Sequence, residues 1–256
     1  MKYHKLIIIL LILLICVVCN IKYLITSFFK THVFVNVHVQ PSSALTIVLL
    51  NYKRPHNIMK SVPILHSYEH VHEIVIINGL KENIVNFDHL HKVVQFQHDN
   101  TIGGAIRFYA TCNHDHIMFL DDDHIPSEKY VNMGLHILEH DKTAMLGNTS
   151  RMCSDRYYII PFSGNMVLTQ CMFVHKDTLE LIMELFDSYY YIMKENRGNG
   201  EDILFNHLYK KLYNRLPIVL LPYGHMQTLD QDTGSYRGKQ EHMHRRSQLC
   251  NTLHSQ

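Results

Sequence analysis

Three consecutive acids, Asp121, Asp122 and Asp123, directly follow the apolar run at residues 117–120. On an extended segment, residues two apart face the same way. Asp121 and Asp123 are therefore predicted to point into one crevice, with Asp122 pointing elsewhere unless the chain turns. Crowded carboxylates repel one another without a cation, and hard oxygen ligands suit Mg²⁺ or Mn²⁺, which bind diphosphate oxygens readily. The alternative is an acidic turn capping a helix that begins near residues 126–128. Three acids exceed what a cap needs, which favours the metal interpretation.

A second acidic pair, Glu201 and Asp202, follows a Gly-Asn-Gly bend and opens a segment with leucine at positions 204, 208 and 212. This spacing predicts an amphipathic helix. Acids in a first helical turn are favourable through the macrodipole alone, so these residues by themselves fit a structural role as well as a catalytic one. Arg246, in the tail segment HRRS, has a guanidinium suited to phosphate, although a solvated surface charge is the alternative.

Four apolar runs are predicted to be the strands that position these groups. They are ALTIVLLN, HEIVIING, HKVVQFQ and HDHIMFL, beginning at residues 44, 72, 91 and 114. Helix-like apolar spacing in residues 61–70 and 100–112 separates them, which predicts an α/β domain with a mostly parallel sheet. Ligands bind at the carboxyl ends of strands in such sheets. Polar clusters follow all four runs, at residues 51–54, 78, 99–100 and 121–123.

Composition narrows the class of protein. A chain of 256 residues, 46% hydrophobic, can fill one sizeable core, so one domain is expected. The formal net charge of +1, without a basic run, argues against nucleic acid as a partner. The 21 histidines are spread along the chain without Cys-x-x-Cys partners, so a multi-histidine zinc site is disfavoured. Sparse cysteines outside the apolar N-terminus indicate no disulfide framework, and Asn148 heads a lone glycosylation sequon.

The N-terminus predicts a membrane anchor. Lysines at positions 2 and 5 precede an apolar stretch that reaches bilayer thickness when extended to residue 29. A cleaved signal peptide is the alternative, but no small-x-small cleavage site follows convincingly. We therefore expect a cytoplasmic tip and signal anchor at 1–29, a stem at 30–43 and the globular domain at 44–256. Type II single-pass topology is the preferred orientation.

Several segments in combination resemble glycosyltransferase family 64, the C-terminal transferase domain of exostosin and exostosin-like proteins, which has the GT-A fold. They are TIVLLNYKRP, EIVIING, IMFLDDDHIP, NMVLTQCMFVHKDTLELI, NGEDILFNHLYKKLYNRLPIVL and HMHRRSQLCN, in the family's order over residues 44–252. Asp-x-Asp alone is common. The combination is specific because three further features accompany it: MVLT with the following His-Lys, Glu-Asp with Asn206, and the tail Arg-Ser.

The resemblance implies that six residues contact a nucleotide sugar: Arg54 and Asn78 at the uridine, Asn100 and Arg107 at the base and ribose, and Asp121 and Asp122 at the ribose and sugar. Asp123 would be the direct protein ligand of Mn²⁺ or Mg²⁺, with diphosphate and water completing the coordination. Asp202 matches the family's proposed catalytic aspartate, with Glu201 beside it. Arg246 matches the arginine that reaches the diphosphate. Tyr157, Tyr158 and the region 148–162 would help to form the acceptor site.

Two departures from the family pattern stand out. The family has a cysteine before the Glu-Asp pair that bonds to one in the tail. Gly200 occupies that position here, so that disulfide is expected to be absent. Arg107 lies two residues farther from Asn100 than the family spacing.

The function implied is a membrane-anchored, Mn²⁺-dependent, retaining transferase in a Golgi- or ER-type compartment if the source is eukaryotic. It would move a sugar, GlcNAc or a related hexosamine, from a UDP donor to a glycan or glycolipid. Two alternatives stay open: an inverting GT-A transferase that uses another nucleotide sugar, and a catalytically silent carbohydrate-binding or scaffold protein of the same fold. A metal phosphohydrolase lacks a second ligand cluster.

Overall fold

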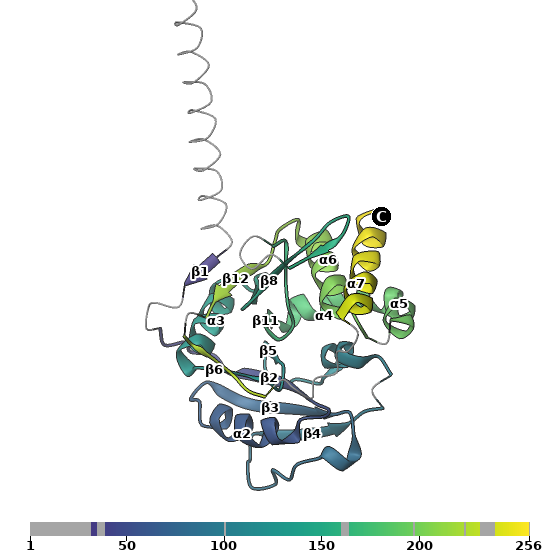
Figure 1. Ribbon diagram of the computed structural model, residues 1–256. Coiled ribbons are helices and arrows are strands. Elements are labelled where there is room, and N and C mark those ends of the chain that lie inside the picture. Colours follow the sequence, from purple (N-terminus) through teal and green to yellow (C-terminus); the bar gives the residue numbers. More distant parts are fainter. Residues whose placement is uncertain are drawn as a thin grey trace, which may run out of the picture.

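The computed structural model describes residues 32–34, 39–99, 101–159, 164–196, 198–222, 224–230 and 239–255. Its central sheet is built from β1 (His32–Phe34), β2 (Leu45–Asn51), β3 (Val71–Asn78), β4 (Val93–Gln97), β5 (His116–Leu120), β7 (Met145–Gly147), β11 (Cys171–His175) and β12 (Ile218–Leu221). The strand order is β1-β12-β7-β11-β5-β2-β3-β4 (Figure 1). β11 is antiparallel to β5 and β7, and the other neighbours are parallel. The predicted α/β class with a mostly parallel central sheet is confirmed.

The four predicted strands are β2, β3, β4 and β5. Side chains of β2 and β5 alternate between the two faces of the sheet and are buried on both, which explains their nearly continuous apolar sequences. β2 lies between β3 and β5 in parallel register, so Asn51 is paired with Asn78 and Leu49 with Leu120. The polar residues that follow these strands therefore gather at one edge of the sheet.

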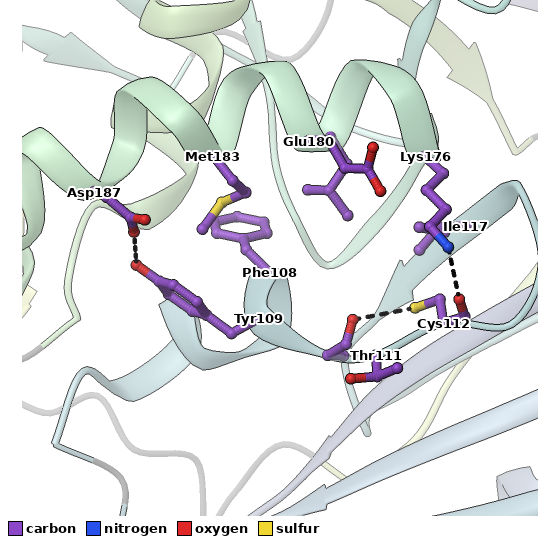
Figure 2. Close-up of a pocket in the computed structure, with 11 residues that line it drawn as sticks. Phe108, Tyr109, Thr111, Cys112, Ile117, Lys176, Glu180, Met183 and Asp187 are labelled. Atoms are coloured by element: carbon purple, nitrogen blue, oxygen red, sulfur yellow. Dashed lines mark hydrogen bonds between the residues drawn. The ribbon is translucent and has the colours of Figure 1, made fainter.

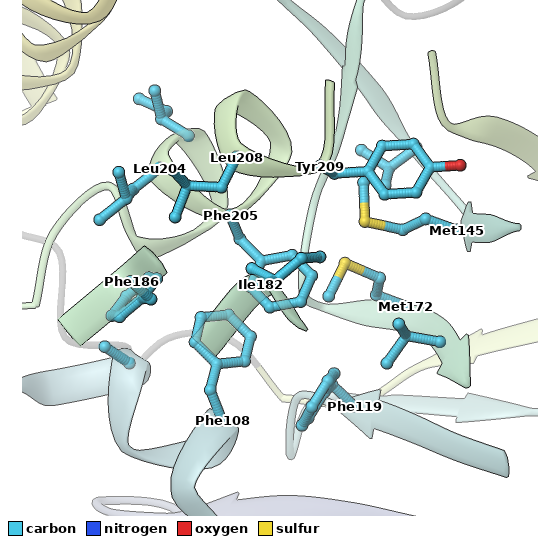
Figure 3. Close-up of a cluster of buried hydrophobic side chains, with 14 of the residues drawn as sticks. Phe108, Phe119, Met145, Met172, Ile182, Phe186, Leu204, Phe205, Leu208 and Tyr209 are labelled. Carbon is cyan, nitrogen blue, oxygen red and sulfur yellow. The ribbon is translucent and has the colours of Figure 1, made fainter. Parts of the chain in front are cut away.

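Helices cover both faces of the sheet. α2 (Pro55–His66) and α3 (Glu128–His140) pack on one face. The other face carries α4 (Lys176–Phe186), α6 (Glu201–Tyr213), α7 (Lys239–His254) and the 3-10 helix η2 (Gly103–Tyr109). In Figure 3, Phe108 of η2 lies against Phe205 of α6, with ring centroids 4.4 Å apart, and also contacts Phe119 of β5. This aromatic packing fixes η2 and α6, which both carry predicted site residues.

The remaining elements are short. They are η1 (Lys81–Asn83), η3 (Asp187–Tyr189), α5 (Tyr190–Glu195), β6 (His124–Pro126) paired with β13 (Met226–Thr228), and a small sheet of β8 (Ser150–Cys153), β9 (Tyr157–Tyr158) and β10 (Met166–Val167). The helix predicted near residues 126–128 begins at Glu128, with the Ser127 hydroxyl accepting a hydrogen bond from the amide of Tyr130.

Three local features differ from the sequence interpretation. The helix expected within residues 61–70 already begins at Pro55, because proline at a first helical position lacks only an amide that would be unpaired there. The helical segment in 100–112 is a 3-10 helix. Within the segment expected to be a stem, β1 pairs in parallel with β12 at the sheet edge.

The predicted anchor at residues 1–29 lies outside the described residues. Among the helices that the structure describes, none combines the length and apolar character that crossing a bilayer requires. Asn148 of the sequon is buried, with 5% of its surface exposed.

Cys153 and Cys250 form a disulfide, although the spacing of the cysteines indicated no disulfide framework. Their Cα atoms lie 5.4 Å apart, within the range disulfides require. The bond joins the end of β8 to α7. It differs from the pairing that the resemblance implies, which would need a cysteine where this chain has Gly200. The sequence interpretation failed because the partners are 97 residues apart and meet only through the fold.

A pocket of about 320 Å³ lies between η2 and α4 and is lined by Phe108, Cys112, Ile117 and Lys176, among others (Figure 2). Burial raises the pKa of the Cys112 thiol to about 12, so it is not a nucleophile at neutral pH. Ile117 is near the start of β5, and the three aspartates follow its end. The pocket and the aspartates are thus at opposite ends of one strand, and the pocket is not at the edge where ligands of such sheets bind.

Candidate active site

The chain turns immediately after β5, which separates the three aspartates differently from the prediction. The amide of His124 donates a hydrogen bond to the carbonyl of Asp121 at 3.3 Å, closing the turn. Asp122 and Asp123 both contact Arg54, and Asp121 contacts Arg107. Asp121 and Asp123 were expected to point together only on an extended chain, and the turn is the exception that this prediction named.

Arg54, at the N-terminal end of α2, holds the first group. Its Nε donates to Asp122 Oδ2 at 2.9 Å and its Nη2 to Asp122 Oδ1 at 2.5 Å, a bidentate pair, while Nη1 lies 3.2 Å from Asp123 Oδ2. Burial raises the pKa of Asp122 to about 6 despite the opposing effect of Arg54. Burial acts in the same direction on Asp123, but its contacts with His124 and Arg54 outweigh it and lower the pKa of Asp123.

Arg107 holds the second group. It is 3% exposed; its Nη2 donates to Asp121 Oδ1 at 2.7 Å and its Nη1 to the carbonyl of Thr169 at 2.9 Å. Burial alone would lower the pKa of Arg107, but Asp121 and Glu201 reverse this effect, so the guanidinium stays charged. Arg107 therefore connects the aspartates after β5 to the acids of α6.

Glu201 and Asp202 begin α6 behind Arg107. Asp202 is 3% exposed; its Oδ2 accepts from Arg246 Nη2 at 2.5 Å and its Oδ1 from the amide of Ile203 at 2.9 Å. Glu201 Oε1 accepts from the Thr169 hydroxyl at 3.2 Å. Burial first, and then the neighbouring Asp202, raise the pKa of Glu201 to about 7. The two adjacent acids therefore differ, with Asp202 paired to an arginine and Glu201 favoured as the neutral acid.

Arg246 reaches the site from α7. Its guanidinium carbon lies 4.3 Å from the centroid of the Tyr157 ring, a cation–π contact, and the residue is 6% exposed. Its Nε is buried without a hydrogen-bond partner among the described residues. Cys250 follows four residues later, on the same face of α7, so the disulfide to Cys153 holds the helix face that carries Arg246.

Two glycines allow this close packing. Gly200, just before α6, has φ +94°, and a Cβ there would lie 2.5 Å from Leu249 Cδ2 of α7. A Cβ at Gly104 in η2 would lie 2.8 Å from Glu201 Oε1. At Gly200 a side chain would meet both an unfavourable backbone conformation and the neighbouring helix.

The remaining predicted residues are placed less favourably for ligand contact. Asn78 is 1% exposed, accepts from Asn51 Nδ2 at 2.8 Å and donates to Gln95 Oε1 at 3.2 Å, so its amide is used between strands. Asn100 lies outside the described residues. Tyr157 packs on Arg246, and Tyr158 is 40% exposed. Asn206 bridges the backbone of Val167 through both ends of its amide, a structural role.

Three contributors were not identified from the sequence. His124 Nδ1 lies 2.5 Å from Asp123 Oδ1. The carbonyl of Asp230 accepts from Arg54 Nη1 at 3.2 Å, because β13 returns the chain beside β6. The hydroxyl of Thr169 donates to Glu201. His124 follows the acids directly in sequence and could have been suspected, whereas nothing local marks Asp230 or Thr169.

The aspartates after β5 offer donor atoms that suit a divalent cation. The donors after β5 are hard carboxylate oxygens, which fit Mn²⁺ or Mg²⁺. In the described part of the chain, the aspartates do not converge as a three-ligand cage. This agrees with a single direct protein ligand, for which Asp123 stays the predicted residue.

Comparison with known proteins identifies the family. The model of the glycosyl transferase family 64 domain matches residues 45–256. The chain belongs to glycosyl transferase family 64. Membership confirms the resemblance at family level and means that the chain carries a glycosyltransferase domain, as the sequence predicted. A search of curated proteins gives no match.

Solved structures show the same fold for this family 64 chain. A crystal structure of GalNAc-T7 with UDP, GalNAc and Mn²⁺ superposes with a TM-score of 0.53 at 11% identity. The match covers 76% of this chain and 45% of the other, so the present chain spans under half of that protein's length. At this identity the likeness concerns the fold alone, which is of the GT-A glycosyltransferase type.

Proposed function

We propose that this family 64 protein is a metal-dependent, retaining glycosyltransferase that moves a sugar, GlcNAc or a related hexosamine, from a UDP donor to a glycan or glycolipid. The observation that carries the proposal is one continuous cluster of paired charges at the carboxyl end of β5. It runs from Arg54 through the three aspartates and Arg107 to the acids of α6. Ligands bind at this edge of α/β sheets.

The donor would occupy the space beside the aspartates. Asp123 would hold Mn²⁺ or Mg²⁺, and a bound cation stabilises the charge that develops on a departing diphosphate. Asp121 and Asp122 would contact the ribose and sugar, with Arg54 and Arg107 around the nucleoside. The resemblance alone assigns Asn78 and Asn100 to the nucleoside, and the amide of Asn78 is already used between strands. The GalNAc-T7 structure, crystallised with UDP and Mn²⁺, supports this donor class by its fold.

Arg246 and Asp202 would act at the reacting end of the donor. The buried Nε of Arg246 lacks an acceptor in the described structure, and a diphosphate oxygen would supply one. Removing a partner from a buried donor is costly, so a ligand that restores one gains affinity.

Retention of configuration requires attack and departure on one face, through either an ion pair or a covalent intermediate. Both carboxylate oxygens of Asp202 already accept hydrogen bonds, from Arg246 and from the Ile203 amide. A carboxylate held in this way is a weak nucleophile but still stabilises a neighbouring cation. The geometry therefore favours an ion pair with an oxocarbenium-like sugar, held by Asp202.

The N-terminal stretch would anchor this domain as a type II single-pass protein, in a Golgi- or ER-type compartment if the source is eukaryotic. The apolar character of residues 6–19 and its extension to residue 29 support this proposal.

The test is donor hydrolysis by the purified full chain, screened over UDP- and GDP-sugars with Mn²⁺, Mg²⁺ or EDTA. The variants are Asp123→Ala, Asp202→Asn, which keeps the shape of the side chain, and Asp88→Asn, an exposed acid hydrogen-bonded to Asn86, as the control. We expect metal-dependent turnover of one UDP-sugar that is lost in the first two variants and kept in the control. Product configuration then separates retaining from inverting transfer.

Absence of turnover with every donor, together with absence of UDP–Mn²⁺ binding by calorimetry, would overturn the proposal in favour of a silent protein of this fold. Turnover that survives Asp123→Ala would remove Asp123 as the metal ligand.

A further inference from the structure

A second cluster of metal-binding side chains lies on α3, away from the acids after β5. His136, Glu139 and His140 each present a ligand atom, and these atoms lie within 4.8 Å of one another. Among the residues that the structure describes, this is the one set of three histidine, cysteine or carboxylate side chains that converges in this way. Residues three and four apart share a helix face, so the local backbone itself brings the three together.

The histidine geometry leaves nitrogen lone pairs for a metal. His140 Nδ1 lies 2.8 Å from the carbonyl oxygen of His136. A carbonyl can only accept, so Nδ1 carries the proton and Nε2 presents its lone pair. His136 Nδ1 lies 3.8 Å from Glu139 Oε2. In a tetrahedral zinc site with bonds of about 2.0–2.1 Å, ligand atoms are about 3.3 Å apart, so small side-chain rotations suffice.

Glu139 is held by the chain that enters the domain. Its Oε1 accepts hydrogen bonds from the amides of Ser42 and Ser43, at 2.6 and 2.7 Å, and from the Ser42 hydroxyl at 3.1 Å. Oε1 is thereby fixed and Oε2 is turned toward His136. Such outer hydrogen bonds orient a carboxylate for metal binding.

We propose that His136, Glu139 and His140 bind one Zn²⁺ at the junction between α3 and the segment that leads into β2, with water as the fourth ligand. Two imidazole nitrogens and one carboxylate suit zinc, whereas Mn²⁺ and Mg²⁺ prefer the all-oxygen donors after β5. The bound ion fixes Glu139 in the rotamer that accepts from Ser42 and Ser43. It thus ties the incoming chain to α3 independently of any sugar transfer.

The experiment is a Zn²⁺ titration of the metal-free full chain in detergent by calorimetry, with thermal unfolding followed in parallel. His140→Ala and His136→Ala test the cluster. His72→Ala is the matched control, because His72 contacts His114 ring to ring, with centroids 5.7 Å apart, but lacks a converging carboxylate. Asp123→Ala accounts for any zinc bound at the acids after β5. Circular dichroism shows whether each variant is folded.

We expect one Zn²⁺ per chain that survives Asp123→Ala and His72→Ala and raises the unfolding temperature. Its affinity should fall at least about tenfold in His140→Ala and in His136→Ala, since even loss of an outer hydrogen-bond partner costs that much. The proposal is wrong if the wild type binds no Zn²⁺, if neither α3 variant weakens binding, or if Asp123→Ala alone abolishes it. None of these results depends on transferase activity, so this proposal and the proposed function can fail separately.

Discussion

Loss of the Cys153–Cys250 disulfide should lower the free energy of unfolding by about 4–5 kcal/mol. The bond joins residues with a sequence separation of 97. In the chain-entropy treatment, a closed loop of about 100 residues restricts the unfolded chain by about 4.7 kcal/mol at 25 °C. This is a large share of the 5–15 kcal/mol typical of a domain. The disulfide should therefore contribute much of the net stability.

The assay is urea unfolding of wild type and Cys153→Ser, each with and without a thiol reductant. The wild type in reductant should approach the variant, and the variant should not respond to reductant. Cys112→Ala, at a buried free thiol, is the control. It should retain the full difference between oxidising and reducing conditions, whatever its own stability. A loss below about 1 kcal/mol in Cys153→Ser would refute the loop-closure argument.

The same variant tests whether the bond positions Arg246. Cys250 is fully buried and lies one helical turn beyond Arg246 on α7. Without the disulfide, α7 is held by noncovalent contacts, chiefly Leu249 and Leu253 in the core. We expect donor turnover by Cys153→Ser to fall under conditions where the protein is still folded. Unchanged turnover would show that packing alone holds the arginine.

Three further predictions concern the acids of α6 and the bend before them. Asp202→Ala should lower the free energy of unfolding by about 3–5 kcal/mol, because it leaves Arg246 buried and unpaired. Adding Arg246→Met should recover part of this loss, which a double-mutant cycle measured by urea unfolding would show. The pKa of Glu201 is raised from 4.5 to about 7, so folding favours its protonated form, and this stabilisation is lost as pH rises through about 7. Glu201→Gln stays neutral at all pH values. Its free energy of unfolding should therefore match that of wild type near pH 4 and be higher by up to about 3 kcal/mol at pH 8, measured by urea unfolding at both pH values. Gly200→Ala should lower the free energy of unfolding by about 1–3 kcal/mol, measured by thermal unfolding. The loss should be smaller in Gly224→Ala, because Gly224 also has a positive φ but an added Cβ there would have no atom within 4 Å.

The sheet, and the edge of it at which the charged residues gather, were predictable from local sequence. Buried parallel strands have almost continuous apolar sequences, so β2, β3 and β5 are evident in a single chain. The polar residues that follow these strands were then expected at one edge, and the aspartates after β5 do lie there beside Arg54 and Arg107. The sequence left the turn at Asp121–His124 open, because aspartates are compatible with both an extended segment and a turn.

Features that join distant segments could not be read from the sequence. Cys153 and Cys250 meet because β8 and α7 pack on the same side of the sheet. Likewise, Arg54 contacts the carbonyl of Asp230, 176 residues later, only because β13 pairs with β6.

The α3 cluster is local, yet it was overlooked among 21 histidines, since helical spacing becomes informative only when the third ligand is also considered.

The contacts of Asp123 indicate which of its oxygens a cation would reach with less disturbance. Its Oδ1 contacts His124 Nδ1 and its Oδ2 contacts Arg54 Nη1. Each carboxylate oxygen has two lone pairs, so a metal ion would bind beside one of these partners or replace it. Arg54 can yield Nη1 and keep its bidentate pair with Asp122, whereas His124 would give up its 2.5 Å contact with Asp123. Exchange at Oδ2 therefore disturbs less of the structure. Arg54→Lys, which lacks the fork needed to hold both acids, should weaken the restraint on Asp122 more than that on Asp123.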